Sequence, residues 1–179
     1  MRRRWVWWVV AVAAVAEIPE DQRPSLRIIG APPPDGEAYA RQLYEAITAA
    51  GMLSTSAYDG ALRRTLLAER IRRASLVLVP SHSETFGLVA LEAAASGVPV
   101  VASATGGLRE AVVDGETGIL LETDDPAVWS QVMMTLLQDD DMRQRLAANA
   151  RAHALRHSWA ASTRALLAGY GEVLSTSAS

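Results

Sequence analysis

The segment that most constrains the fold is residues 76–97. It begins with a short apolar run, residues 76–80, of the kind that forms a fully buried strand in a parallel sheet. A polar turn follows, and residues 87–96 are almost wholly apolar, which predicts a buried helix closed by Gly97. A strand, a turn with a glycine and a helix N-terminus, in this order, form the arrangement in which open α/β sheets bind anionic ligands.

Backbone and side-chain groups around this turn are candidates for ligand binding. The N–H groups of Phe86, Gly87 and Leu88 are expected to point out of the first helical turn, where the helix dipole favours an anion. Glu84 lies in the turn, and Glu92 lies inside the apolar helix. Burying a carboxylate there costs free energy unless donors satisfy it. From spacing alone, Glu92 is either a structural group bonded to an arginine or backbone donors, or a ligand-binding group.

Strand-like and helix-like segments alternate along the rest of the chain. Strands are predicted at residues 26–30, 76–80, 98–102 and 118–121, with a weaker pattern at 52–58. Helices are predicted at residues 37–50, 61–74, 87–96, 108–112, 125–137 and 141–157, and a last helix is capped by Ser158. This alternation predicts an α/β fold with a Rossmann-like parallel sheet flanked by helices. We divide it into a Rossmann-like domain (25–140), C-terminal helices (141–174) and a disordered tail (175–179).

Residues 1–24 have two interpretations. Three arginines, an apolar stretch and Ala14-Val15-Ala16 are typical of a secretory signal, although the stretch is too short to span a membrane. The alternative is a helix over residues 5–17 that precedes the strand at 26–30. We prefer the helix, because the segment runs directly into that strand.

Composition excludes several classes of function. A net charge of −3 and a pI near 5.6 give no reason to expect nucleic acid or an anionic membrane as a partner. The absence of cysteine excludes disulfides and thiolate chemistry. All 17 basic residues are arginine, so no mechanism can use a lysine ammonium. The dinucleotide and P-loop glycine motifs are also absent.

Histidines and clustered acids have simpler interpretations than metal binding. His153 and His157 have metal-ligand spacing, but no carboxylate motif accompanies them, so we expect a surface pair. Asp139-Asp140-Asp141 is expected to cap a helix. His82, alone in its loop, is expected to be a solvated side chain. The sequence therefore predicts no metal site and no cofactor.

Several motifs together resemble a known family. Glu84 and Glu92 are separated by seven residues that include Phe86-Gly87-Leu88. The chain continues with the segments 97–102, Thr105-Gly106-Gly107-Leu108-Arg109-Glu110 and Asp114-Gly115-Glu116-Thr117-Gly118. This closely resembles the donor-binding half of the family-4 retaining glycosyltransferases, which have the GT-B fold of two Rossmann-like domains. The mycothiol-pathway N-acetylglucosaminyl transferases and sucrose-phosphate-synthase-like members are the nearest in appearance. The similarity spans roughly residues 11–174 and is densest at 76–121.

The resemblance implies roles for particular residues. Glu84 corresponds to a catalytic glutamate beside the donor sugar, and Glu92 to a glutamate that binds the ribose hydroxyls. The implied donor-binding residues are Ser83, Thr85, Phe86, Gly87, Leu88, Glu92, Gly106 and Gly107, the last two forming a wall of the sugar pocket. The nucleotide-sugar, a UDP- or GDP-sugar, is a substrate rather than a cofactor, and the family needs no metal. Such a donor implies a cytoplasmic location.

The sequence also departs from the family. Members carry, before the strand at 26–30, another strand and turn with an arginine and a lysine that neutralise the diphosphate, and a whole N-terminal acceptor domain. We therefore expect a C-terminal GT-B half that is incomplete at its N-terminus, inactive alone, and dependent on a separate acceptor-binding domain or chain. The alternatives are a non-catalytic nucleotide-sugar-binding module and a truncated remnant.

Overall fold

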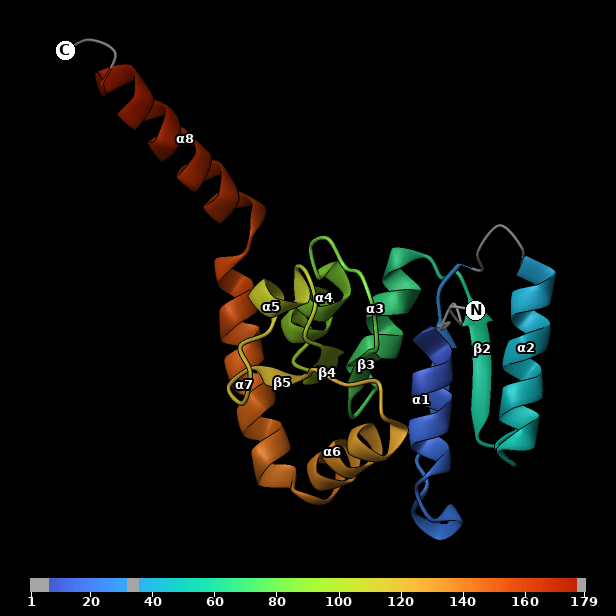
Figure 1. The fold of residues 1–179 in the computed structure, drawn as a ribbon. Helices are drawn as coiled ribbons and strands as arrows, with labels where there is room; N and C mark the ends of the chain where they lie inside the picture. The colour runs from blue at the N-terminus through green and yellow to red at the C-terminus, as the bar shows by residue number, and fades with distance from the viewer. Residues whose placement is uncertain (1–6, 32–35, 177–179) are drawn as a thin grey trace.

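Parallel strands with helices on both faces make up the protein (Figure 1). The computed structural model describes residues 7–31 and 36–176. The strands are β1 (Leu26–Ile29), β2 (Ser56–Gly60), β3 (Val77–Val79), β4 (Val100–Ser103) and β5 (Gly118–Leu121). The helices are α1 (Trp7–Ala16), the 3-10 turn η1 (Glu20–Gln22), α2 (Gly36–Ala49), α3 (Arg64–Arg72), α4 (Leu88–Ala95), α5 (Leu108–Ala111), α6 (Pro126–Gln138), α7 (Asp140–Arg156) and α8 (Trp159–Thr176).

The strands form two sheets. β1 pairs with β2 in one, and the other has the order β3-β4-β5. Both are parallel, with Leu26 opposite Ser56 in the first sheet and Val100 opposite Val77 and Gly118 in the second. The α/β class and the parallel pairing predicted from the sequence are confirmed. The division into two sheets was not predicted.

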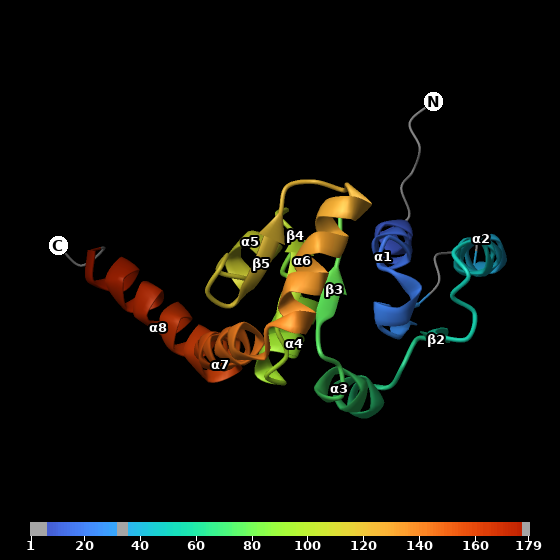
Figure 2. The same cartoon turned by 90° about the horizontal axis from the view of Figure 1, so that it is seen from below.

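Two hydrophobic clusters lie on opposite faces of the strands. The first joins α1, α2 and α6, with Trp8, Leu43 and Trp129 among its buried side chains. The second joins α3, α4 and α5 to β3 and β4, with Ile71, Ala90 and Leu108 buried. α7 packs against α4 and α6. Figure 2 shows α1 and α6 on the opposite side of the strands from α3 and α4.

α1 is apolar on every side and lies deep in the first cluster. Its residues Val10, Val12, Ala14 and Val15 are all buried, as expected of a helix without a polar face. The Arg23 guanidinium stabilises the chain that follows α1, because it donates hydrogen bonds to the carbonyls of Ala16, Ile18 and Ala50 at 3.0–3.1 Å. The segment for which a helix or a signal-like stretch was predicted is thus helical over Trp7–Ala16.

Three predicted helix caps are confirmed. The carboxylate of Asp125 accepts from Ala127 N–H at 3.0 Å, and that of Asp139 accepts from Met142 N–H at 2.8 Å. Ser158 Oγ accepts from Ala161 N–H at 3.3 Å. Each side chain satisfies one of the backbone donors left free at a helix start.

Burial differs from the prediction in four places. Val77 and Leu78 of β3 are only partly buried, because β3 is an edge strand. The residues of β5 after Gly118 are also only partly buried. α4 has an exposed side in place of the predicted full burial. His153, expected at the surface, is 8% exposed.

The last helix projects away from the body (Figure 1). Leu166, Leu167 and Tyr170 on α8 are about 60% exposed. α8 includes Ser175 and Thr176, which were assigned to a disordered tail, and residues 177–179 lie outside the described part. Across the described residues, every helix is either too short or too polar to cross a bilayer.

Candidate functional site

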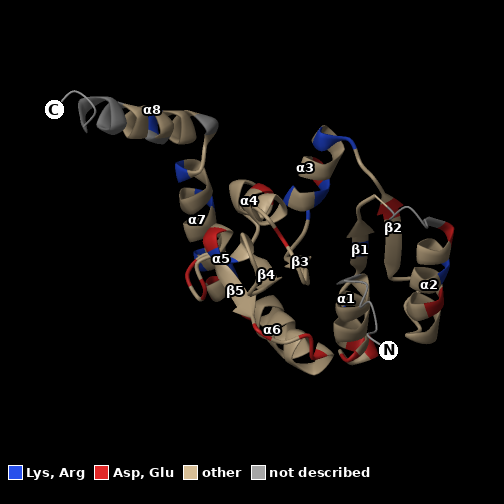
Figure 3. Cartoon of the chain, turned by 45° about the horizontal axis from the view of Figure 1, so that its top comes forward, with Lys and Arg blue, Asp and Glu red and all other residues tan. Residues whose placement is uncertain are grey.

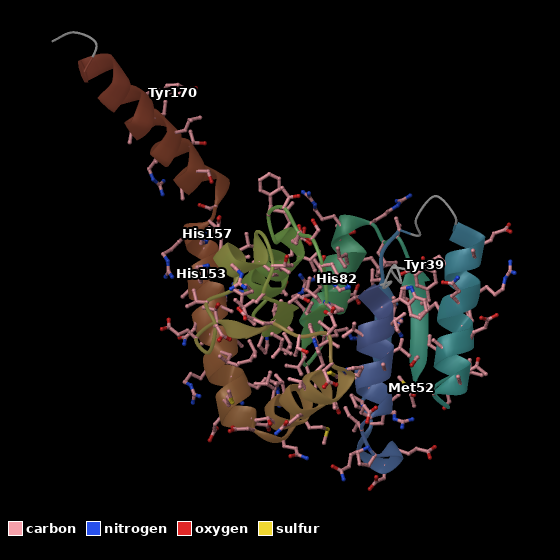
Figure 4. The ribbon with its side chains drawn as sticks, in the orientation of Figure 1. Tyr39, Met52, His82, His153, His157 and Tyr170 are labelled. Carbon is pink, nitrogen blue, oxygen red and sulfur yellow. The ribbon has the colours of Figure 1, made fainter. Side chains whose placement is uncertain are left out.

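The β3–α4 turn lies where open α/β sheets bind ligands. It follows the carboxyl end of β3, and the β4–α5 turn, residues 104–107, follows the carboxyl end of β4 beside it. Ligands of such sheets bind outside the carboxyl ends of the strands. Figure 4 labels His82 in the first of these turns.

Hydrogen bonds and close backbone contacts hold the two turns together. Gly107 N–H donates to the Glu84 carbonyl at 2.8 Å, and Thr105 Oγ1 donates to the His82 carbonyl at 3.2 Å. A Cβ on Gly106 would lie 2.0 Å from the Glu84 carbonyl oxygen, and one on Gly107 would lie 2.5 Å from that of Thr85. Glycine is therefore required at both positions by close backbone approach, and Glu84 and Gly106–Gly107 form one unit.

Gly87 is required for two reasons. Its φ of 65° is in the left-handed region, which side chains other than glycine rarely adopt. A Cβ there would also lie 2.6 Å from the Ala111 Cβ and 2.9 Å from the Gly107 carbonyl oxygen. This glycine lets the chain turn sharply into α4 while it contacts α5.

The Glu84 side chain lies against the backbone directly before α4, where the sequence predicted free N–H groups. Its Oε1 accepts from Gly87 N–H at 3.2 Å and from Phe86 N–H at 3.4 Å. The prediction of unbonded donors was therefore wrong for Phe86 and Gly87, because a carboxylate two and three residues earlier can reach back to them. An incoming anion has to share or displace this contact.

Glu92 differs most from its predicted surroundings. Its side chain is exposed rather than enclosed in an apolar helix, and in the described part of the chain it makes no hydrogen bond or ion pair. Leu88, one turn earlier on the same side of α4, is 60% exposed. The helix therefore presents a carboxylate on an exposed face, one to two turns after the β3–α4 turn. A structural role in which Glu92 bonds to an arginine or to backbone donors is not what the structure shows.

A groove borders the two turns. It measures about 360 Å³ and is lined by Ser81, His82, Ser103, Ala104, Thr105, Arg109, Leu121, Glu122, Thr123 and Asp124. Arg109 pairs with Glu122 at 2.9 Å, and His82 Nδ1 lies 3.5 Å from Asp124. Ser103 is 7% exposed, and its Oγ has no partner among the described residues.

Most of these groove residues were not predicted from the sequence. Ser103, Glu122 and Asp124 stand at or just after the carboxyl ends of β4 and β5. Their positions at the carboxyl ends of two predicted strands could have identified them as candidate ligand-binding residues from the sequence. His82, predicted to be a solvated side chain, is 39% exposed at its side chain but has this acidic neighbour.

Most of the residues implied by the family resemblance are exposed, whereas Gly87 and Gly107 are buried and Glu84 is partly buried. Ser83, Thr85 and Phe86 are exposed, and Phe86 reaches 70%. The groove takes in Ser81 and His82 but not residues 83–88. The structure thus brings Glu84, Gly87, Gly106 and Gly107 together, and leaves Glu92 near them on the exposed side of α4.

Charged residues of both signs lie around the site, but in the described part of the chain they form no group suited to a metal ion. In the described ranges, no three His, Cys, Asp or Glu side chains are grouped so that they could hold a metal ion. Basic side chains colour both ends of α3 in Figure 3, and they include Arg70 and Arg72.

Comparison with known proteins gives a consistent result. A sequence profile of the family described as "Glycosyl transferases group 1" matches residues 9–153. A D-inositol 3-phosphate glycosyltransferase of Thermomonospora curvata is 42% identical over 143 residues, which are 80% of this chain and 33% of that protein. The chain therefore spans about a third of the length of this curated relative.

Solved structures match over nearly the whole chain. Sucrose-phosphate synthase from Thermosynechococcus elongatus has a TM-score of 0.83 and 30% identity, covering 95% of this chain and 43% of that one. HepE of Anabaena, solved in complex with UDP, has a TM-score of 0.78 and 25% identity, covering 93% and 44%. The matched region in both is less than half of the larger protein.

Proposed function

Because the chain belongs to the group 1 glycosyl transferases and has the fold of a GT-B C-terminal domain, we propose that it is the donor-binding half of a retaining glycosyltransferase. Its substrate is a nucleotide-sugar, with a UDP-sugar as the first candidate because HepE was solved with UDP. Such a donor would place the reaction in the cytoplasm.

The exposed carboxylate of Glu92, which has no partner among the described residues, is the observation that carries this proposal. An ionised carboxylate accepts two hydrogen bonds, and the vicinal hydroxyls of a ribose supply two donors at matching distance. Leu88, one turn earlier on α4, and Phe86, in the turn before the helix, offer exposed apolar surface. A nucleoside bound to Glu92 would direct its diphosphate toward the N-terminus of the same helix, where backbone N–H groups favour negative charge.

Glu84 and the glycines would act on the sugar and the diphosphate. Glu84 now accepts hydrogen bonds from the N–H groups of Phe86 and Gly87, directly before α4. When a diphosphate takes these donors, the Glu84 carboxylate is released to the adjacent position, where it would hold the sugar. Gly106 and Gly107 would allow close approach along the neighbouring turn. In the proposed reaction the charge on the leaving diphosphate is met by backbone N–H groups and arginine side chains rather than by a metal.

The acceptor side of the reaction would come from another domain or chain. Most of the candidate donor residues are exposed, Glu92 among them, whereas transfer requires a site that excludes water. The region matched in this chain is only 33% of the relative from Thermomonospora curvata. We therefore expect the isolated 179-residue chain to bind the donor but to transfer no sugar.

Calorimetric titration with UDP, GDP and UDP-N-acetylglucosamine tests the donor site. Replacing Glu92 with alanine or glutamine should weaken UDP binding about tenfold or more, because a charge-assisted hydrogen bond contributes about 1.5–3 kcal/mol. The matched control is Glu45→Ala, which removes an exposed helical glutamate from α2. The proposal fails if no nucleotide binds, or if Glu92→Ala and Glu45→Ala bind UDP equally.

A transfer assay tests the catalytic part separately. Donor hydrolysis and transfer are followed with the isolated chain and again after mixing with a candidate acceptor domain. Binding of UDP without turnover in either mixture would point to a nucleotide-sugar-binding module. Turnover that Glu84→Gln abolishes would support the transferase.

A further inference from the structure

A junction of two residues connects α7 to α8. α7 ends at Arg156 and α8 begins at Trp159, so only His157 and Ser158 lie between the helices. Figure 1 shows α8 turning away from the axis of α7 and projecting from the body. The described side chains of α8 between residues 160 and 170 are nearly all exposed. Because little packing holds α8, its direction depends on the backbone of the junction.

His157 ends α7 with its own side chain. In a continuous helix the N–H of residue 157 would donate to the carbonyl of residue 153. Here that N–H donates to the Ala154 carbonyl at 3.0 Å, and His157 Nδ1 donates to the His153 carbonyl at 3.1 Å. The imidazole thus replaces the backbone N–H at this carbonyl. The φ and ψ of His157, −95° and 27°, depart from helical values.

One turn earlier, the contacts of His153 fit only its neutral form. His153 Nδ1 lies 3.2 Å from Arg156 Nη2, and a guanidinium can only donate. Nδ1 must therefore accept, which places the single proton of the neutral ring on Nε2. The residue is 8% exposed, and Nε2 has no hydrogen-bond partner among the described residues.

A proton added to His153 would break this arrangement. It can bind only at Nδ1, where the new N–H would face the N–H groups of Arg156. The centroids of the His153 and His157 rings are 4.4 Å apart, so the new cation would also lie against the His157 ring. Burial lowers the pKa of His153, and His157 and Arg156 lower it further. Acid is therefore needed to add this proton.

The elements around α7 supply no charge that would offset the repulsion. α6 and β5, which pack on α7, contain no ionisable residue, and the one in α4, Glu92, is exposed. In α5, Arg109 pairs with Glu122, and Glu110 acts on the pKa of His153 through its backbone. A protonated His153 would therefore have no carboxylate from these elements as a partner.

We propose that His153, Arg156 and His157, here called the hinge cluster, make the α7–α8 junction a proton-sensitive hinge. With His153 neutral, the His157 side chain holds the His153 carbonyl, and the chain turns between the helices. With His153 protonated, repulsion moves the His157 imidazole away, and the His157 N–H takes the carbonyl that it leaves. α7 and α8 then join into one helix, which redirects the exposed apolar residues of α8. The hinge goes beyond the proposed transferase function and requires no nucleotide.

Amide hydrogen exchange of the whole chain, resolved by NMR, tests whether the helices join. The Ser158 N–H makes no backbone hydrogen bond in the described part of the chain. In a joined helix it would donate to the Ala154 carbonyl. We expect its protection, corrected for intrinsic exchange at each pH, to rise at least about threefold from pH 7.5 to pH 5. The carbon shifts of His157 and Ser158 should move toward helical values over the same range.

Two variants separate the hinge from a general effect of acid. His153→Gln keeps an acceptor for Arg156 but cannot be protonated, so its Ser158 amide should stay unprotected at pH 5. His157→Ala frees the His153 carbonyl at every pH, so its Ser158 amide should be protected already at pH 7.5. His82→Gln, which removes a histidine far along the chain, should respond as the wild type does. If His153→Gln does not fold, the exposed His157 site still decides the outcome.

A distance measurement tests whether α8 changes direction. The chain has no cysteine, so Gln42→Cys on α2 and Ala168→Cys on α8 provide two unique exposed sites for spin labels. The distance between the labels should change from pH 7.5 to pH 5 in the wild type and stay constant in His153→Gln. An unchanged distance or unchanged Ser158 protection in the wild type would overturn the proposal. So would a His153→Gln chain that responds like the wild type, or a His157→Ala chain with an unprotected Ser158 amide.

Discussion

Glu84 and the N-terminus of α4 form a contact that any anionic ligand must change. The carboxylate holds the Phe86 and Gly87 N–H groups at 3.4 and 3.2 Å, the donors that a diphosphate would use. Two negative groups at one helix end repel each other, so ligand binding and the position of Glu84 are coupled. This coupling would deliver Glu84 to the sugar only when the diphosphate is in place.

We predict that Glu84→Ala strengthens the binding of inorganic pyrophosphate about fivefold. Removing a carboxylate at contact distance relieves about 1 kcal/mol of repulsion in a solvated site. The same change should lower the free energy of unfolding by about 1 kcal/mol, because the hydrogen bonds from Phe86 and Gly87 N–H to Glu84 are lost. Calorimetry and urea unfolding measure the two effects. Unchanged pyrophosphate affinity, with Glu45→Ala as the charge control, would show that the anion does not bind at this helix end.

Gly106→Ala is predicted to lower the free energy of unfolding by about 3 kcal/mol and to abolish UDP binding. The new Cβ would lie 2.0 Å from the Glu84 carbonyl oxygen, at a φ of 45°, so overlap and backbone strain add together. Gly115→Ala is the matched control, since Gly115 has a φ of 73° but no atom within 4 Å of an added Cβ. It should cost only about 1 kcal/mol. Equal costs in urea unfolding would mean that the turns can separate without strain.

At the scale of elements, α7 carries a histidine whose surroundings oppose its charge. Burial lowers the pKa of His153 below its usual 6.5, and the nearby His157 and Arg156 lower it further, while the Glu110 backbone acts in the opposite direction. The His153 and His157 rings lie 4.4 Å apart, and Arg156 lies 3.2 Å from His153 Nδ1. The native state therefore favours a neutral His153.

Stability is predicted to fall on acidification below about pH 6.5 because of His153. The unfolded chain takes up a proton near pH 6.5 whereas the folded chain does so only at lower pH, so protons favour unfolding in that window. The stabilisation is complete above pH 6.5 and is lost as the pH falls through the folded pKa. Thermal unfolding of His153→Gln should depend less on pH from 7.5 to 5.5 than that of the wild type. A His82→Gln control with the same reduced dependence would contradict the assignment.

At the scale of the molecule, α8 adds surface rather than core. Nearly all its described side chains between residues 160 and 170 are exposed, and Leu166, Leu167 and Tyr170 form part of its apolar surface. The helix points away from the body (Figure 1). The body is held together instead by α1, which contributes to a core shared by both sheets.

Deleting residues 158–179 is predicted to change the free energy of unfolding by no more than about 0.5 kcal/mol, because little packing is lost. The truncated chain should also bind less of a fluorescent hydrophobic dye, since exposed apolar surface is removed. Urea unfolding and dye titration provide the two measurements. A clear drop in the unfolding midpoint would show that α8 packs on the body in solution.

Local patterns determined the class of fold and most of its elements. The apolar run at 98–102 became the fully buried β4, the acids at Asp125 and Asp139 became caps, and alternation of strands and helices led to parallel pairing. The family resemblance implied that Gly106 and Gly107 form a wall of the sugar pocket, but their close backbone contact with the glutamate turn was not predicted. The predicted elements and caps depend on side-chain periodicity and on contacts within a few residues, which a sequence records directly.

Tertiary structure alone decided which apolar segments are covered. Residues 76–80 and 98–102 are similarly apolar, yet Val77 and Leu78 of β3 are only partly buried whereas β4 is fully buried, because only β4 has strands on both sides. Glu92 is exposed because nothing among the described residues covers that side of α4. His153, by contrast, is buried, and neither outcome follows from the local sequence. Burial depends on neighbours distant in the sequence, and strand pairing is a property of the whole sheet; an apolar run by itself specifies neither.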